Sequence, residues 1–230
     1  NIGLVGGSVN GADYVGGLVG QVSSGNISNA YATGTVSGNN YIGGLVGYFS
    51  GTGSLSQSYA TGNVSGVVAG SSYIGGLAGY LDGGIYNLLN ISDVYATGNV
   101  SAGVSGSYVI DNYIGGLVGY SAANINNAYA TGDINLRSKS GYYIGGLAGY
   151  NGSILKNVHA TGNINLSYIG QYVGGLVGSN NNFHGYGLIS NAYATGNINA
   201  GIGSSGGATY VGGLVGQNSA YIENAYATGN

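Results

Sequence analysis

The sequence predicts an all-β protein: a parallel β-solenoid (β-helix) of about seven coils of roughly 33 residues, with three short strands in each coil. Two short sequence blocks alternate strictly along the chain, and the spacing between blocks varies while the blocks themselves do not. Insertions confined to such intervening segments are typical of solenoids, because stacking holds the strands and the corners accept extra residues. Only 4% of the residues are charged, against about 25% in an average soluble domain.

The first block is the heptapeptide Tyr-[Ile/Val]-Gly-Gly-Leu-[Val/Ala]-Gly. It starts at Tyr14, Tyr41, Tyr73, Tyr113, Tyr143, Tyr172 and Tyr210. The second block is Tyr-Ala-Thr-Gly, with His159 in place of the tyrosine in one copy. It starts at Tyr31, Tyr59, Tyr95, Tyr129, His159, Tyr193 and Tyr226. Paired glycines would cost a helix about 1 kcal/mol each relative to alanine, whereas the β-branched and aromatic residues favour strands.

Three further columns appear when the copies are aligned on the second block. The position four residues before it is aliphatic: Ile27, Leu55, Ile91, Ile125, Leu155, Ile189 and Ile222. The position two residues before it is an amide or a carboxylate: Asn29, Gln57, Asp93, Asn127, Asn157, Asn191 and Asn224. The position five residues after its start is Val or Ile: Val36, Val64, Val100, Ile134, Ile164 and Ile198.

These columns predict where each coil has its strands. One strand ends at Ala-Tyr-Ala, one runs through Gly-Asn-Val, and one covers the heptapeptide. The two aliphatic columns are separated by an odd number of positions along the sequence, so a straight strand would place their side chains on opposite faces. Since both are expected to point inward, we predict a bend or bulge between them at Thr-Gly. A second interpretation makes each block its own coil of about 16 residues, which gives fourteen thin layers; consistent differences between the blocks favour seven wide coils.

In-register stacking explains the shortage of charge. Equivalent residues of adjacent coils lie about 4.8 Å apart, and a column of like charges at that spacing is destabilising. Uncharged side chains that stack on copies of themselves are favoured instead. The predicted structural ladders are the tyrosines Tyr31, Tyr59, Tyr95, Tyr129, Tyr193 and Tyr226, the asparagines Asn29, Asn127, Asn157, Asn191 and Asn224, and the leucines Leu18, Leu45, Leu77, Leu117, Leu147, Leu176 and Leu214.

The composition argues against several classes of function. Three basic residues against six acidic ones leave no basic surface for nucleic acid. The sequence contains no run of about 20 apolar residues, so no helical membrane span is expected in this segment. His159 and His184 match no catalytic or metal-binding motif, and the six acidic residues are scattered over the coils. We therefore expect no enzyme, no catalytic residue, no cofactor and no metal.

The Gly-Gly-Leu-[Val/Ala]-Gly block and its Tyr-Ala-Thr-Gly-Asn partner resemble the GLUG repeat, over almost the whole chain and in seven copies. That repeat occurs in large bacterial surface proteins, including filamentous-haemagglutinin-like adhesins and some immunoglobulin A peptidase-like proteins. The resemblance implies a surface-exposed β-solenoid stalk. It does not imply peptidase activity, because the family has no shared catalytic residues.

We expect residues 1–230 to form a single repeat solenoid without a capping domain, since both ends interrupt the repeat at nearly the same phase. The leading hypothesis is a structural segment of an extracellular or cell-surface filament or adhesin stalk that associates with itself, head to tail or laterally. The alternative is an adhesive surface that binds carbohydrate, with sugars on the tyrosine columns, or a host protein. A remote alternative is ice binding through the threonine column of Thr33, Thr61, Thr97, Thr131, Thr161, Thr195 and Thr228.

Overall fold

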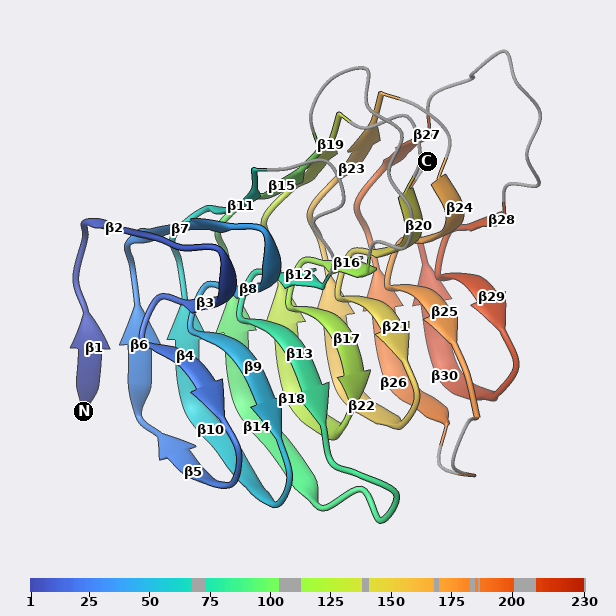
Figure 1. Ribbon diagram of the computed structural model, residues 1–230. Coiled ribbons are helices and arrows are strands. Elements are labelled where there is room, and N and C mark those ends of the chain that lie inside the picture. Colours follow the sequence, from blue (N-terminus) through green and yellow to red (C-terminus); the bar gives the residue numbers. More distant parts are fainter. Residues whose placement is uncertain are drawn as a thin grey trace.

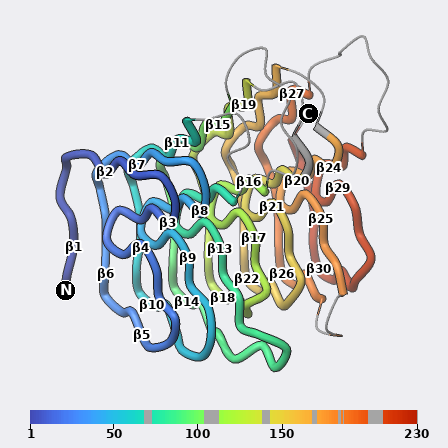
Figure 2. Tube along the Cα trace, in the orientation of Figure 1, coloured from blue at the N-terminus to red at the C-terminus, as the bar shows by residue number. Residues whose placement is uncertain are grey.

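The computed structural model describes the chain except for residues 68–72, 104–112, 138–140, 168–169, 183–184, 186, 201–209 and 230. Within this part the regular secondary structure is β-strand throughout, and all strand pairs are parallel. The coils stack along one axis, and the colour runs from blue at one end of the stack to red at the other (Figures 1 and 2). The predicted parallel β-solenoid is confirmed.

The described strands form four sheets that run along the axis, here called A to D. Sheet A contains β1 (Ile2–Leu4), β5 (Gly25–Ser28), β6 (Ala30–Ala32), β10 (Gly53–Ala60), β14 (Leu89–Ala96), β18 (Asn124–Ala130), β22 (Ile154–Ala160), β26 (Leu188–Ala194) and β30 (Tyr221–Ala227). Sheet B contains β2 (Ser8–Asn10), β7 (Thr35–Gly38), β11 (Val64–Gly66), β15 (Val100–Ala102), β19 (Ile134–Leu136), β23 (Ile164–Leu166) and β27 (Ile198–Ala200).

The other two sheets come from the heptapeptide. Sheet C contains β3 (Asp13–Gly16), β8 (Asn40–Gly43), β12 (Ile74–Gly75), β16 (Tyr113–Gly115), β20 (Gly141–Gly145), β24 (Gly170–Gly174) and β28 (Tyr210–Gly212). Sheet D contains β4 (Val19–Val22), β9 (Val46–Ser50), β13 (Ala78–Asp82), β17 (Val118–Ala122), β21 (Ala148–Asn151), β25 (Val177–Asn180) and β29 (Val215–Asn218). All three predicted strand positions are therefore occupied, and the third is divided in two at Gly-Gly-Leu.

The pairing register shows one wide coil per repeat. Tyr59 pairs with Tyr31 of the preceding coil and with Tyr95 of the following coil, so each second block lies beside the next second block. The heptapeptides pair with one another in the same way, as Ile114 with Ile144. The interpretation of fourteen thin layers is wrong, because it would require the two kinds of block to pair with each other.

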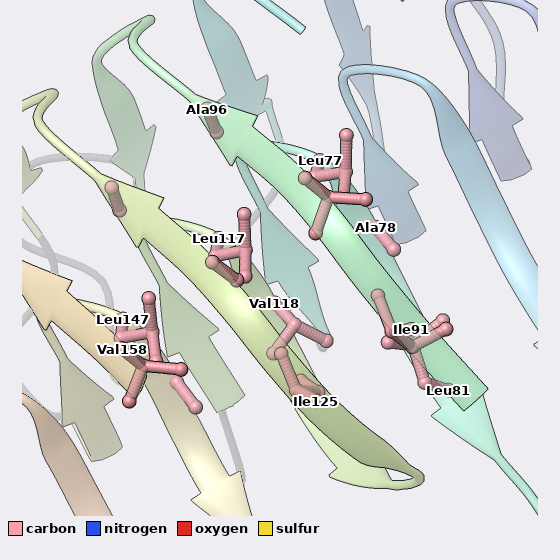
Figure 3. Close-up of a cluster of buried hydrophobic side chains, with 14 of the residues drawn as sticks. Leu77, Ala78, Leu81, Ile91, Ala96, Leu117, Val118, Ile125, Leu147 and Val158 are labelled. Atoms are coloured by element: carbon pink, nitrogen blue, oxygen red, sulfur yellow. The ribbon is translucent and has the colours of Figure 1, made fainter. Parts of the chain in front are cut away.

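The interior contains two hydrophobic cores that run along the axis. The larger core lies between sheets A and D, and its leucines Leu77, Leu117 and Leu147 follow one another from coil to coil (Figure 3). The smaller core lies between sheets B and C and consists mainly of Val and Ile, such as Ile42, Val64 and Ile114. Leu18 and Leu214 are partly buried, while the other predicted ladder leucines are at most 1% exposed.

A waist separates the two cores. The second glycine of each heptapeptide lies there, opposite the alanine that follows the tyrosine of the second block. A Cβ atom on Gly44 would lie 2.8 Å from the Cβ of Ala60 and 2.1 Å from the carbonyl oxygen of Gly76 in the next coil. Contacts this short are not available to a real Cβ, so the waist accepts only glycine where a following coil stacks on it, as at Gly44. The block order Gly-Gly-Leu thus places a close approach directly beside a large core side chain.

The corner and the shift in side-chain alternation lie at different places. The chain turns from sheet A to sheet B at Thr-Gly, as predicted, between Ala60 and Val64. The prediction that the alternation of inward- and outward-facing side chains also shifts at Thr-Gly is wrong. Leu55, Ser58 and Ala60 are all buried in β10, and Gln57 is left out of the pairing with the next coil. The left-handed backbone at Gln57 therefore shifts the alternation of inward-facing side chains, two residues before the tyrosine.

Candidate functional site

The surface of the solenoid consists of side-chain ladders, and the longest is aromatic. On sheet A the rings of Tyr31, Tyr59, Tyr95, Tyr129, His159, Tyr193 and Tyr226 stack in one column. Adjacent ring centroids lie 4.7 to 5.4 Å apart with interplanar angles of at most 13°. The register of the strands produces this spacing directly, because equivalent residues follow each other at the separation of paired strands.

Two further tyrosine columns lie side by side on sheets C and D. The first consists of the tyrosines that start the heptapeptides, from Tyr14 to Tyr210. The second consists of Tyr48, Tyr80, Tyr120 and Tyr150, whose rings meet the first column edge-on, as in the pair Tyr41–Tyr48 at 5.3 Å and 88°. The second column was not predicted, although a tyrosine directly follows the heptapeptide in four copies.

In these two columns the hydroxyls of Tyr41, Tyr80, Tyr120 and Tyr150 stay protonated at physiological pH. Burial raises the pKa of Tyr41, Tyr80 and Tyr150, and neighbouring tyrosines raise it further. Burial and the neighbouring Tyr150 raise the pKa of Tyr120 to about 12. With raised pKa values, these four phenols do not act as bases at neutral pH. Because the rings stack from coil to coil, their faces are turned toward one another, and an aromatic strip for sugar rings is not favoured.

The predicted asparagine column has a backbone role that sequence analysis missed. The left-handed conformation, with φ between 48° and 56°, is adopted by Asn29, Gln57, Asp93, Asn127, Asn157, Asn191 and Asn224. They are the left-handed residues at which the alternation of inward- and outward-facing side chains shifts. Asn and Asp tolerate this conformation better than other non-glycine residues. The side chains form only partial ladders, in which Asn127 Nδ2 donates to Asp93 Oδ1 and Asn191 Nδ2 donates to Asn157 Oδ1.

This role predicts how position 127 responds to substitution. Asn127→Val places a β-branched residue at φ 55°, and we expect a loss of about 1–2 kcal/mol in the free energy of unfolding. Asn127→Gly should be close to neutral, because glycine adopts this conformation without a steric penalty. Urea denaturation followed by tyrosine fluorescence measures both. Asn126→Val, at the exposed neighbouring position of the same strand, is the matched control, and equal losses for all three variants would contradict the prediction.

A continuous amide ladder lies at the corner that follows Thr-Gly. The Oδ1 atoms of Asn63, Asn99, Asp133 and Asn163 each accept a hydrogen bond of 2.8 to 3.0 Å from the backbone N–H of the equivalent residue in the next coil. This column was not predicted, although Asn follows Thr-Gly in most copies. The ladder ties adjacent corners together where the chain leaves sheet A.

The sequence repeat matches a known family model over most of the chain. The GLUG motif matches seven times, at residues 11–37, 38–65, 70–101, 111–135, 140–165, 169–199 and 207–230. The chain belongs to the GLUG family. No curated protein and no solved structure matches significantly. The GLUG repeats stacked as a β-solenoid fit a structural repeat segment.

The described part of the GLUG repeats has a marked hollow on its surface, over the outer face of sheet B. It encloses about 560 Å³ and is lined by Asn63, Ser65, Gly66, Asn99, Ser101, Ala102, Gly103, Asn135, Leu136, Arg137, Asn165, Leu166, Ser167 and Asn199. Its floor, here called the floor column, is Ser65, Ser101, Asn135, Asn165 and Asn199, one residue from each of five successive GLUG coils. No aromatic or acidic residue is among the described residues that line it.

Other candidate residues of the GLUG repeats are dispersed. Within the described residues, no group of three His, Asp or Glu side chains comes together. His184, Lys139 and Asp111 lie outside the described residues. The threonines from Thr61 to Thr195 are exposed, but they lie at the corner between sheets A and B and not on a flat face, which does not favour ice binding. In the part of the chain that the structure describes, no helix is long and apolar enough to cross a membrane.

His159 predicts a pH dependence of stability. Its ring lies between those of Tyr129 and Tyr193, and burial lowers its pKa below the ordinary value of 6.5. Between the lowered pKa and 6.5, the unfolded chain binds more protons than the folded chain, so this contribution to stability is lost as the pH falls. We expect the melting temperature of the wild type to fall more than that of His159→Tyr on acidification below 6.5. Identical pH profiles for the two proteins would contradict this expectation.

Proposed function

We propose that this GLUG solenoid is a non-enzymatic structural segment of an extracellular or cell-surface filament or adhesin stalk. The observation that carries the proposal is the continuity of the ladders: each coil repeats the hydrogen bonds and ring stacking of the coil before it. A coil added by the same chain or by a second copy continues every ladder in register. The 4% charge content offers little electrostatic repulsion to such association.

Negative-stain electron microscopy of the purified 230-residue chain tests self-association. We expect rods that lengthen with protein concentration, because open head-to-tail contacts produce fibres. Ile222→Lys, in a strand at the end of sheet A, should abolish rods while the fold persists. Leu88→Lys, at a 48% exposed position between β13 and β14, is the control and should leave them intact. Short discrete particles that bind glycans and never form rods would overturn the filament proposal.

A ligand-binding adhesive surface is the second candidate function. The observation that favours it is the polar groove over sheet B, which the structural role does not require. The two candidates are compatible, since the groove lies on the side of the coils and the stacking contacts lie along the axis.

A further inference from the structure

The groove over sheet B presents repeated polar groups with almost no charge. In the floor column, Ser101 Oγ donates to Ser65 Oγ at 3.2 Å, Asn165 Nδ2 donates to Asn135 Oδ1 at 3.1 Å, and Asn199 Nδ2 donates to Asn165 Oδ1 at 2.9 Å. A primary amide carries two N–H donors and an acceptor oxygen with two lone pairs. The ladder hydrogen bonds use only some of these donors and acceptors, and the unused ones lie on a half-buried surface. Among the described residues that line the groove, Arg137 is the single charged one.

This chemistry discriminates between classes of ligand. Nucleic acid requires several basic groups, and the described residues that line the groove include one, Arg137. A peptide that adds a strand requires a free sheet edge, whereas the floor is the face of a sheet whose strands are paired. Sugar hydroxyls, which both donate and accept, complement amides and serine hydroxyls, which do the same. The strand spacing of about 4.8 Å is also close to the length of one sugar residue in an extended polysaccharide.

We propose that the groove over sheet B binds an extended, neutral polysaccharide along the solenoid axis, with about one sugar residue for each coil of the floor column. This inference sharpens the adhesive function named above and rests on it, whereas microscopy tests the filament function separately. Each coil contributes a few hydrogen bonds to solvated hydroxyls, which are individually weak. Affinity therefore comes from the number of coils engaged at once, and it increases with the length of the glycan.

Affinity gel electrophoresis of the full chain tests the proposal. The gels contain hydroxyethyl cellulose or laminarin, which are neutral, or polygalacturonate, which is anionic. We expect at least one neutral polymer to retard the protein and to do so more strongly than polygalacturonate. Short oligosaccharides of the same linkage should compete better as they lengthen toward five residues. Absence of retardation by both neutral polymers, or retardation by polygalacturonate alone, overturns the proposal.

Matched variants locate the site. Ser101→Val with Asn135→Val removes one serine and one asparagine from the floor column, and we expect at least a tenfold loss of affinity. Ser92→Val with Asn126→Val removes the same two residue types from the outer face of sheet A and should leave affinity unchanged. Retardation that survives in the floor variant overturns the assignment. If that variant fails to fold, hydrogen exchange of the wild type with and without the polymer decides the assignment. We expect the polymer to increase protection over β19 and β23. Protection there that does not exceed the protection in the other sheets would show that the assignment is wrong.

Discussion

Gly116→Ala is expected to destabilise the solenoid strongly. The new Cβ would lie 2.2 Å from the carbonyl oxygen of Gly146 in the next coil and 2.9 Å from the Cβ of Ala130 across the waist. Both neighbours are held by the backbone, so neither moves aside as a flexible side chain would. We expect a loss of about 3 kcal/mol in the free energy of unfolding, at the upper end of ordinary overpacking costs.

Gly213→Ala is the matched control in the 230-residue chain. Gly213 holds the same position in its heptapeptide, but a Cβ there meets only the Cβ of Ala227, at 3.3 Å. We expect a loss below about 1 kcal/mol. Urea denaturation, followed by far-ultraviolet circular dichroism and tyrosine fluorescence, measures both variants. Equal losses at the two positions would show that the stacked carbonyl is not the reason for glycine at the waist.

The glycine content of this chain has a different origin from the one usually assigned to glycine-rich repeats. At the waist, Gly116 lacks the positive φ that favours glycine, and the close approach of two backbones requires it instead. The left-handed positions that recur in every coil belong to Asn29, Gln57, Asp93 and their equivalents. Glycine thus provides packing, and the amide column provides the unusual backbone conformation.

This division explains how far the sequence alone predicted the fold. The inward columns, such as Leu55 and Val64, followed from periodicity, because burial repeats once in each coil. The left-handed backbone at the amide column could not be predicted from the sequence. Asparagine at that position is equally expected for a ladder of side-chain hydrogen bonds. The division of the heptapeptide into two strands was also missed, since Tyr-Ile-Gly-Gly-Leu-Val-Gly has the composition of one continuous strand.

The candidate site shows the same limit. The tyrosine column on sheet A was predicted because one residue type recurs at one position. The floor column of the groove mixes serine in the earlier coils with asparagine in the later ones, as Ser101 and Asn135 illustrate. Its members share a hydrogen-bonding capacity and not an identity, so alignment of the repeats did not reveal them. Concavity depends on how the coils stack and has no local signal in the sequence.

The second large effect is expected at the core leucines, of which Leu117 is the central example. Leu117 is 1% exposed in the core between sheets A and D, and its place in the stack is fixed by backbone bonds. Its N–H donates to the carbonyl oxygen of Leu147 at 2.9 Å, and the N–H of Val118 donates to the same oxygen at 3.0 Å. These bonds hold the bend between sheets C and D in place. The coils on either side therefore cannot close over a missing side chain. Leu117→Ala should therefore leave a cavity and lower the free energy of unfolding by about 2–5 kcal/mol.

Leu88→Ala provides the control for Leu117→Ala, since Leu88 is 48% exposed in the turn that precedes β14. We expect its effect to stay within about 0.5 kcal/mol. In a stack of repeats, stability is the sum of coil terms and interface terms between neighbouring coils, so a cavity in a central coil weakens two interfaces at once. Hydrogen exchange of Leu117→Ala should therefore show lost protection in β13 and β21 as well as in β17. Loss confined to β17 would mean that the coils fold as independent units, which the shared leucine column argues against.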